Sequence, residues 1–367
     1  MKTKKIYYAL AAIVLSAYGC SSRDDLNSSL KSALNANIQQ LNTSLKAISS
    51  SDGYQVLAVP VPEQNAANLV KSPAGPFDST FTTIALADIA GVYDYKALPF
   101  QQGGIPGFRF FQKTADNNLM VVRLPEEKVK HPAGLLHFFP SDTTLVNNYV
   151  ITLSDYLYTY NRPYHVWDYH MASSINVKNT DAGNLQISSS NSKENGYKYS
   201  SGFEFADGYK ASCVYSTGDT ALSVYTISKG GTKLYEEKYT ATKSSLENRH
   251  REMEYTLVIG DVKIVREHKG HGQSGLDSAK VYVNDVLQAN AKVALVDAAA
   301  TDGTDNSIVS KKRELQITFD DGTTATISQL LGDTSLATIR SLFATLRQAG
   351  FATGIVDWIA WDVYNNK

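Results

Sequence analysis

Apolar and polar positions alternate along residues 197–242, as they do in strands whose two faces meet different surroundings. The stretch reads YKYSSGFEFADGYKASCVYSTGDTALSVYTISKGGTKLYEEKYTAT. It is divided at intervals of about eleven residues by Asp207-Gly208, Gly218-Asp219 and Gly230-Gly231. Glycine in such pairs supplies the positive φ of a tight hairpin turn. The pattern therefore predicts consecutive antiparallel strands, and the alternation places Cys213 on an inward face.

The same pattern extends from residue 81 to residue 330, with further turn signals at Gly260-Asp261, Asn284-Asp285 and Asp321-Gly322. Strands without intervening helices form antiparallel sheets. A sheet of a dozen or so strands must curl, split into two layers or close. We expect a mainly β protein with one large antiparallel sheet, as a barrel, a half-barrel or a sandwich. The opening LADIAGVYDY resembles the first strand of lipocalin-like bacterial proteins in Gly91 and Tyr93 alone.

Helical periodicity appears only near the two ends of the chain. Near the N-terminus, spacings of three and four separate Leu26, Leu30, Leu34, Ile38, Leu41, Leu45 and Ile48. This apolar stripe requires a partner, either the rest of the chain or further copies in a coiled coil. The stripe is only about three heptads long and lacks a clear pattern of charges beside it. An oligomer through residues 25–50 is therefore the less favoured alternative.

The second helical stretch closes the chain. One face of it carries Leu336, Ile339, Leu342, Phe343 and Leu346, and Trp358 and Trp361 follow. We expect this segment to pack on the sheet.

The first twenty residues have the pattern of an export signal. Lys2, Lys4 and Lys5 precede an apolar run over residues 6–15, which is too short to span a bilayer. Small residues then lead to Cys20. This arrangement resembles the lipobox of bacterial lipoproteins. The resemblance implies that Cys20 is lipidated on sulfur and becomes the first residue after cleavage, which anchors the protein to a membrane.

Ser21 to Asp25 resemble the short acidic tag of Bacteroidetes-type surface lipoproteins. That resemblance implies an outer-membrane protein that faces the cell exterior. The expected organisation is a signal peptide (1–19), a lipid-anchored helical tether acting as a spacer (20–53), a proline-rich linker (54–80), an antiparallel β domain (81–330) and a C-terminal helical segment (331–367).

Composition narrows the function classes. The 367 residues carry a formal charge of −1, which becomes −4 when Lys2, Lys4 and Lys5 are removed with the signal peptide. A mildly acidic chain without a basic patch argues against nucleic-acid binding. Once Cys20 is lipidated, Cys213 has no cysteine left to pair with, so we expect stability to come from the core.

The chain contains no nucleophile elbow, phosphate-binding loop, dinucleotide fingerprint or zincin helix. Two groups have side chains that bind metals: Glu267, His268 and His271, and Asp297, Asp302, Asp305 and Asn306. Neither has the spacing of a known metal motif, and both are better explained as exposed connections. We therefore expect neither a metal nor a cofactor.

The aromatic run YLYTYNRPYHVWDYH, residues 156–170, is the best candidate for a ligand site. Tyr164 and Trp167 would supply an apolar platform, and Arg162 and Asp168 would bind hydroxyl groups. The competing interpretation places the tyrosines of this run on the core face of a strand.

Three hypotheses for function follow. The leading one is a non-enzymatic surface lipoprotein that binds a glycan or a protein. The alternative is a structural or carrier lipoprotein with an apolar ligand in a curved sheet. The third is a hydrolase, which would require two carboxylates close together in a cleft.

Overall fold

The computed structural model describes residues 29–57, 81–96, 110–130, 140–243, 251–269, 276–297, 313–347 and 350–365. The predicted signal peptide, Cys20, the acidic tag and most of the proline-rich linker lie outside these residues.

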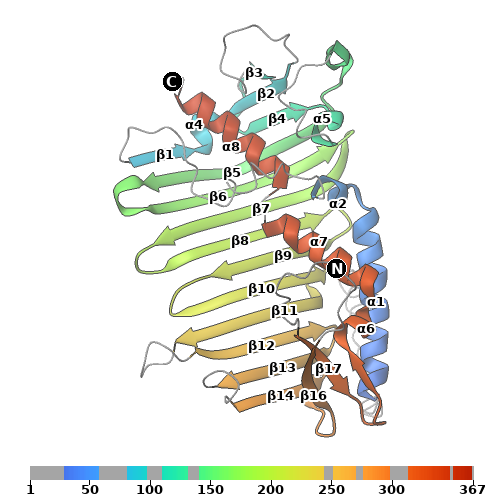
Figure 1. The fold of residues 1–367 in the computed structure, drawn as a ribbon. Helices are drawn as coiled ribbons and strands as arrows, with labels where there is room; N and C mark the ends of the chain where they lie inside the picture. Colours follow the sequence, from blue (N-terminus) through green and yellow to red (C-terminus); the bar gives the residue numbers. More distant parts are fainter. Residues whose placement is uncertain are drawn as a thin grey trace, which may run out of the picture.

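An antiparallel meander forms most of a fifteen-stranded sheet (Figure 1). Its strands are β5 (Tyr149–Asn161), β6 (Val166–Val177), β7 (Thr180–Ser192), β8 (Gly196–Phe205), β9 (Tyr209–Ser216), β10 (Thr220–Lys229), β11 (Thr232–Lys243), β12 (Arg251–Ile259), β13 (Val262–Lys269), β14 (Leu276–Val283) and β15 (Val286–Leu287). Positive φ angles at Gly208, Gly230, Gly231 and Gly260 confirm the glycine turns predicted at these positions, whereas Gly218 lies in the turn between β9 and β10 without a positive φ. Short turns explain why each strand pairs with its neighbour in the sequence.

The other end of the sheet departs from the meander. It contains β1 (Phe81–Ala85), β2 (Gly91–Tyr95), β3 (Phe111–Ala115) and β4 (Met120–Leu124). β2 lies between β3 and β4 and runs parallel to β4, whereas β1 pairs with the second half of β5. Because the edge strands β3 and β15 are not joined, the described sheet is open and does not close into a barrel. A separate sheet contains β16 (Lys292–Asp297), β17 (Arg313–Thr318) and β18 (Thr324–Thr326).

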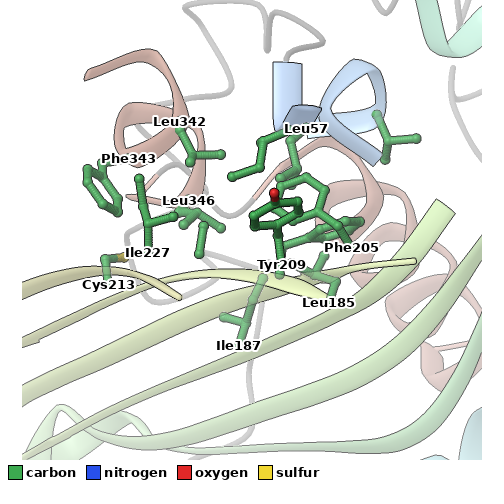
Figure 2. Close-up of a cluster of buried hydrophobic side chains, with 14 of the residues drawn as sticks. Leu57, Leu185, Ile187, Phe205, Tyr209, Cys213, Ile227, Leu342, Phe343 and Leu346 are labelled. Carbon is green, nitrogen blue, oxygen red and sulfur yellow. The ribbon is translucent and has the colours of Figure 1, made fainter. Parts of the chain in front are cut away.

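Helices lie on one face of the large sheet (Figure 1). They are α1 (Leu30–Ser50), α2 (Asp52–Leu57), α6 (Ile327–Leu331), α7 (Asp333–Arg347) and α8 (Gly350–Asn365), with α4 (Leu86–Ile89) and α5 (Glu126–Lys130) near β2 and β4. The predicted N-terminal and C-terminal helices are thus both present. In Figure 2, Leu342, Phe343 and Leu346 of α7 lie over Cys213 and Ile227 of the sheet. Cys213 is 2% exposed, which confirms its inward position.

The N-terminal helix is part of the core and does not stand apart as a spacer. The apolar stripe of α1 packs against β11, β12 and β13, and Leu34, Leu41 and Ile48 are fully buried. Asn42 accepts a hydrogen bond from Ser335 of α7 (2.7 Å). The physical reason is that a stripe of this length exposes a large apolar area unless it is covered, and the sheet provides the cover. Within this chain, the stripe is therefore not available for a coiled coil.

The opposite face of the sheet is polar. Its side chains follow the strand register in rows, one of which contains Asp168, Ser190, Lys198, Ser216, Leu222, Thr240, Glu254 and Glu267. No described helix or strand covers these side chains, most of which are hydroxyl-bearing or charged. The strands also extend beyond the helices at one end (Figure 1). At these strand ends, no described helix covers either face of the sheet.

Candidate binding surface

The turn between β5 and β6 carries Arg162 and Tyr164. The segment Arg162–Tyr164 forms one turn of 3-10 helix, and His165 ends it in the left-handed region with a φ of 51°. Both predicted side chains are exposed, that of Tyr164 by 75%. The side-chain amide of Asn191 on β7 donates to the carbonyl of His165 (2.9 Å), which holds the turn against the sheet.

Trp167 and Asp168 lie on opposite faces of β6. Successive residues of a strand point to opposite sides of the sheet. Trp167 shares the helix side with Tyr169, which is 8% exposed, whereas Asp168 is exposed on the polar side. The two side chains therefore cannot contact the same small ligand, and the structure does not bring the four predicted residues together in one site.

Trp167 belongs instead to a row of aromatic rings that crosses neighbouring strands. Its ring centroid lies 6.2 Å from that of Tyr197 on β8, which lies 5.9 Å from that of Tyr215 on β9. The indole Nε1 donates to Ser189 Oγ (3.2 Å), and the Tyr215 side chain is 43% exposed. Burial raises the pKa of Tyr197, so its hydroxyl stays neutral. We call Trp167, Tyr197 and Tyr215 the aromatic row; its rings have one packed side and one wet side.

The tyrosines at the start of the predicted aromatic run belong to the core. Tyr156 and Tyr158 are 2% and 0% exposed, so the competing interpretation holds for these two residues. Tyr158 packs edge-on against Trp361 of α8, with ring centroids 5.1 Å apart. The run is therefore divided between core and surface within β5 and β6.

Asp168 lines a shallow hollow of about 320 Å³ on the polar face. The residues around it include Ser188, Ser190, Lys198, Ser200, Val214 and Ser216. Ser190 pairs in register with both Asp168 and Lys198, which places the two opposite charges two strands apart. The hydroxyls of Ser188 and Ser200 are hydrogen-bonded to each other at 2.8 Å. The hollow is thus hydroxyl-rich and bordered by one acid and one base.

A carboxyl group is enclosed between α8 and the sheet. Asp357 Oδ1 accepts hydrogen bonds from the hydroxyls of Tyr156 (3.2 Å) and Tyr169 (3.1 Å). Burial raises the pKa of Asp357 to about 7, although the two hydroxyl donors oppose the change. This cluster joins the C-terminal helix to β5 and β6.

Neither metal candidate forms a site in the described structure. Glu267 and His268 are neighbours on β13 and lie on opposite faces of the sheet. Asp297 ends β16, whereas His271, Asp302, Asp305 and Asn306 lie outside the described residues. The parts of the chain that are described hold no group of three metal-binding side chains.

Tyr197 and Tyr215 were not among the residues predicted to bind a ligand. They are separated from Trp167 by two and three hairpin turns along the chain. The alternation of Tyr197 and Tyr199, and of Cys213 and Tyr215, does place each tyrosine on a defined strand face. A register counted from the turns would have placed them next to the tryptophan.

No protein-family model, curated protein or solved structure matches this chain. None of the helices in the described ranges is long and apolar enough to cross a membrane. The interpretation of the surface therefore depends on its geometry and chemistry.

Proposed function

We propose that this chain is a lipid-anchored protein of the bacterial outer membrane, displayed outward, that binds a glycan without catalysing a reaction. The observation that carries the binding function is the aromatic row on the part of the sheet that the helices leave uncovered (Figure 1). The anchor and its location are proposed from Cys20 and Ser21 to Asp25, which lie outside the described residues.

A glycan suits the row because each sugar combines flat apolar faces with a rim of hydroxyl groups. Tyrosine and tryptophan offer an apolar ring and a polar atom to such a ligand. Asn191 of β7 stands in register with Trp167 and Tyr197 and offers an amide, and Ser189, on the same face of β7, offers the hydroxyl that accepts from the Trp167 indole. The row is shallow and wet, which favours a polar ligand over an apolar one.

Nothing in the described hollows favours the carrier alternative, which requires an apolar cavity. Five of the ten residues that line the hollow on the polar face are serines. A second hollow, of about 520 Å³ between α1 and the sheet, is lined by Gln40, Thr43, Ser44, Tyr209, Lys229, Thr232 and Leu234. Residues with polar side chains outnumber apolar residues around both hollows.

Alanine at Trp167 and at Tyr215 tests the proposal. Loss of one ring from a ligand contact costs on the order of 1–3 kcal/mol, so each variant should lose tenfold or more in affinity for a glycan found on an array. Val214 provides a matched control, because it adjoins Tyr215 on β9, is 39% exposed and lies on the opposite face. Val214→Ala should bind like the wild type.

Thermal unfolding of the same variants separates binding from folding. Trp167→Phe loses the hydrogen bond to Ser189. Because it retains an aromatic ring, it should keep most of the affinity for the glycan. A wild-type protein that binds no glycan would refute the proposal. So would Trp167→Ala and Tyr215→Ala variants that bind as well as Val214→Ala. Binding only to another protein would support the other ligand class considered from the sequence.

A further inference from the structure

The aromatic row continues beyond Tyr215. In the strand register, Tyr215 of β9 stands opposite Ser223 of β10, and Ser223 stands opposite Tyr239 of β11. Register partners in adjacent strands point to the same face of a sheet. Tyr239 is 39% exposed, so its ring reaches solvent on the same side as the rest of the row.

Six neighbouring strands, β6 to β11, thus each contribute one side chain to a continuous band on the helix side. In strand order the band reads Trp167, Asn191, Tyr197, Tyr215, Ser223 and Tyr239. Tyr215 is the register partner of Tyr199, so Tyr197 is its diagonal neighbour and joins it by the ring contact. Two small polar side chains, Asn191 and Ser223, lie among four aromatic ones. The band lies at the strand ends away from α1 and α7 (Figure 1).

We propose that this band is a track for a linear, uncharged glycan chain that lies across the strands, and not a pocket for one terminal sugar. The inference rests on the proposed function and specifies its ligand. Trp167 and Tyr239 are five strand spacings apart, which corresponds to about 24 Å. A single sugar covers one or two rings, whereas an extended chain reaches all four.

The spacing of the track fits a polymer of sugars. The length of one pyranose unit in an extended chain is close to one strand spacing, which is about 4.8 Å. About five units therefore cover the band, with rings beneath some units and Asn191 or Ser223 beside the others. Asn191 is held in place by its hydrogen bond to the carbonyl of His165.

The charge of the band indicates which glycans it accepts. None of its six side chains belongs to an Asp, Glu, Lys, Arg or His residue, so the band itself offers no ion pair to an acidic polysaccharide. Tyrosine hydroxyls, one amide and one serine hydroxyl are suited to neutral hydroxyl and acetamido groups.

Calorimetric titration of the detergent-solubilised full-length protein with oligosaccharides of one to six units tests the track. The probes are β-1,4-linked glucose, β-1,4-linked N-acetylglucosamine and α-1,4-linked glucose series. For at least one series, affinity should rise about a hundredfold between two and five units, because the longer chains reach more of the rings.

Two variants test whether the track includes Tyr239. Tyr239→Ala should lower the affinity for the six-unit probe about tenfold and leave that for the two-unit probe unchanged, because a short probe is held by Tyr197 and Tyr215. Ser223→Arg should have the same effect by placing a long charged side chain between Tyr215 and Tyr239. Thr240→Ala, next to Tyr239 but on the polar face, is the matched control.

The outcomes distinguish this inference from the function on which it rests. Equal affinity for two and six units would overturn the track and leave glycan binding intact. Normal binding of long probes by correctly folded Tyr239→Ala and Ser223→Arg variants would do the same. A wild-type protein that binds no probe of any length, or only a protein partner, would overturn both.

Discussion

Replacing Asp357 by asparagine should stabilise the protein at neutral and higher pH. The carboxyl group lies between α8 and the sheet and accepts hydrogen bonds from Tyr156 and Tyr169, which are 2% and 8% exposed. Burial disfavours its charged form and raises the pKa to about 7. In the unfolded chain an aspartate has a pKa of about 3.9.

The sign of the effect follows from proton binding. Between about pH 4 and pH 7 the folded protein retains a proton on Asp357 that the unfolded chain has released. The contribution of this group to the free energy of unfolding is therefore complete below about pH 4 and declines as the pH rises through 7. The two pKa values differ by about 3, which sets a ceiling of about 4 kcal/mol. Because the side chain keeps some accessible surface, we expect about half of that.

Urea unfolding of wild type and Asp357→Asn at a series of pH values from 4.5 to 8.5 measures the effect. The amide keeps an oxygen for the tyrosine hydroxyls and does not titrate. Asp357→Asn should exceed the wild type by about 0.5 kcal/mol near pH 4.5 and by about 2 kcal/mol near pH 8.

Asp207→Asn, in the exposed turn between β8 and β9, is the control and should show no such difference. Parallel pH curves for wild type and Asp357→Asn would refute the reasoning. So would a less stable Asp357→Asn variant at pH 8, because it would mean that the ionised carboxylate stabilises the fold.

Two further predictions concern the N-terminal part of the chain. Leu41→Ala should lower the free energy of unfolding by about 2–5 kcal/mol, because Leu41 is fully buried. Lys46→Ala, on the exposed side of α1, is the control and should change it little. Equal effects of the two substitutions in urea unfolding would contradict the packing of α1. Cys20→Ala should leave an uncleaved precursor or release the protein from membranes. Asp24→Ala combined with Asp25→Ala should protect the β domain from protease added to intact cells. Normal processing with membrane retention, or protection of the wild type, would count against the anchor and the outward display.

Local patterns determined most of the secondary structure. The glycine turns and the alternation around Cys213 predict the hairpins of the meander because a two-residue turn brings adjacent strands together. The stripe from Leu30 to Ile48 likewise predicts α1, because its periodicity belongs to a helix. These signals depend only on residues close in the chain, so the sequence alone is sufficient to read them.

The sequence alone did not choose between closure and an open sheet, and it did not say what would cover the stripe of α1. Both depend on how distant segments pack. α1 and α7, from opposite ends of the chain, cover the same face of the sheet, and no described helix covers the other face. A local pattern records that a surface is apolar and does not identify its partner.

The binding surface shows the same division. Tyr156, Tyr158, Trp167 and Tyr197 all stand on one face of the sheet, yet the first two are buried and the last two border solvent. The difference arises because α8 covers Tyr158 through Trp361, whereas the helices end before the Trp167 end of β6. The sequence by itself determined the strand faces and the aromatic character of this region. Tertiary packing decided which rings remained accessible, because accessibility depends on where a helix more than a hundred residues away comes to rest.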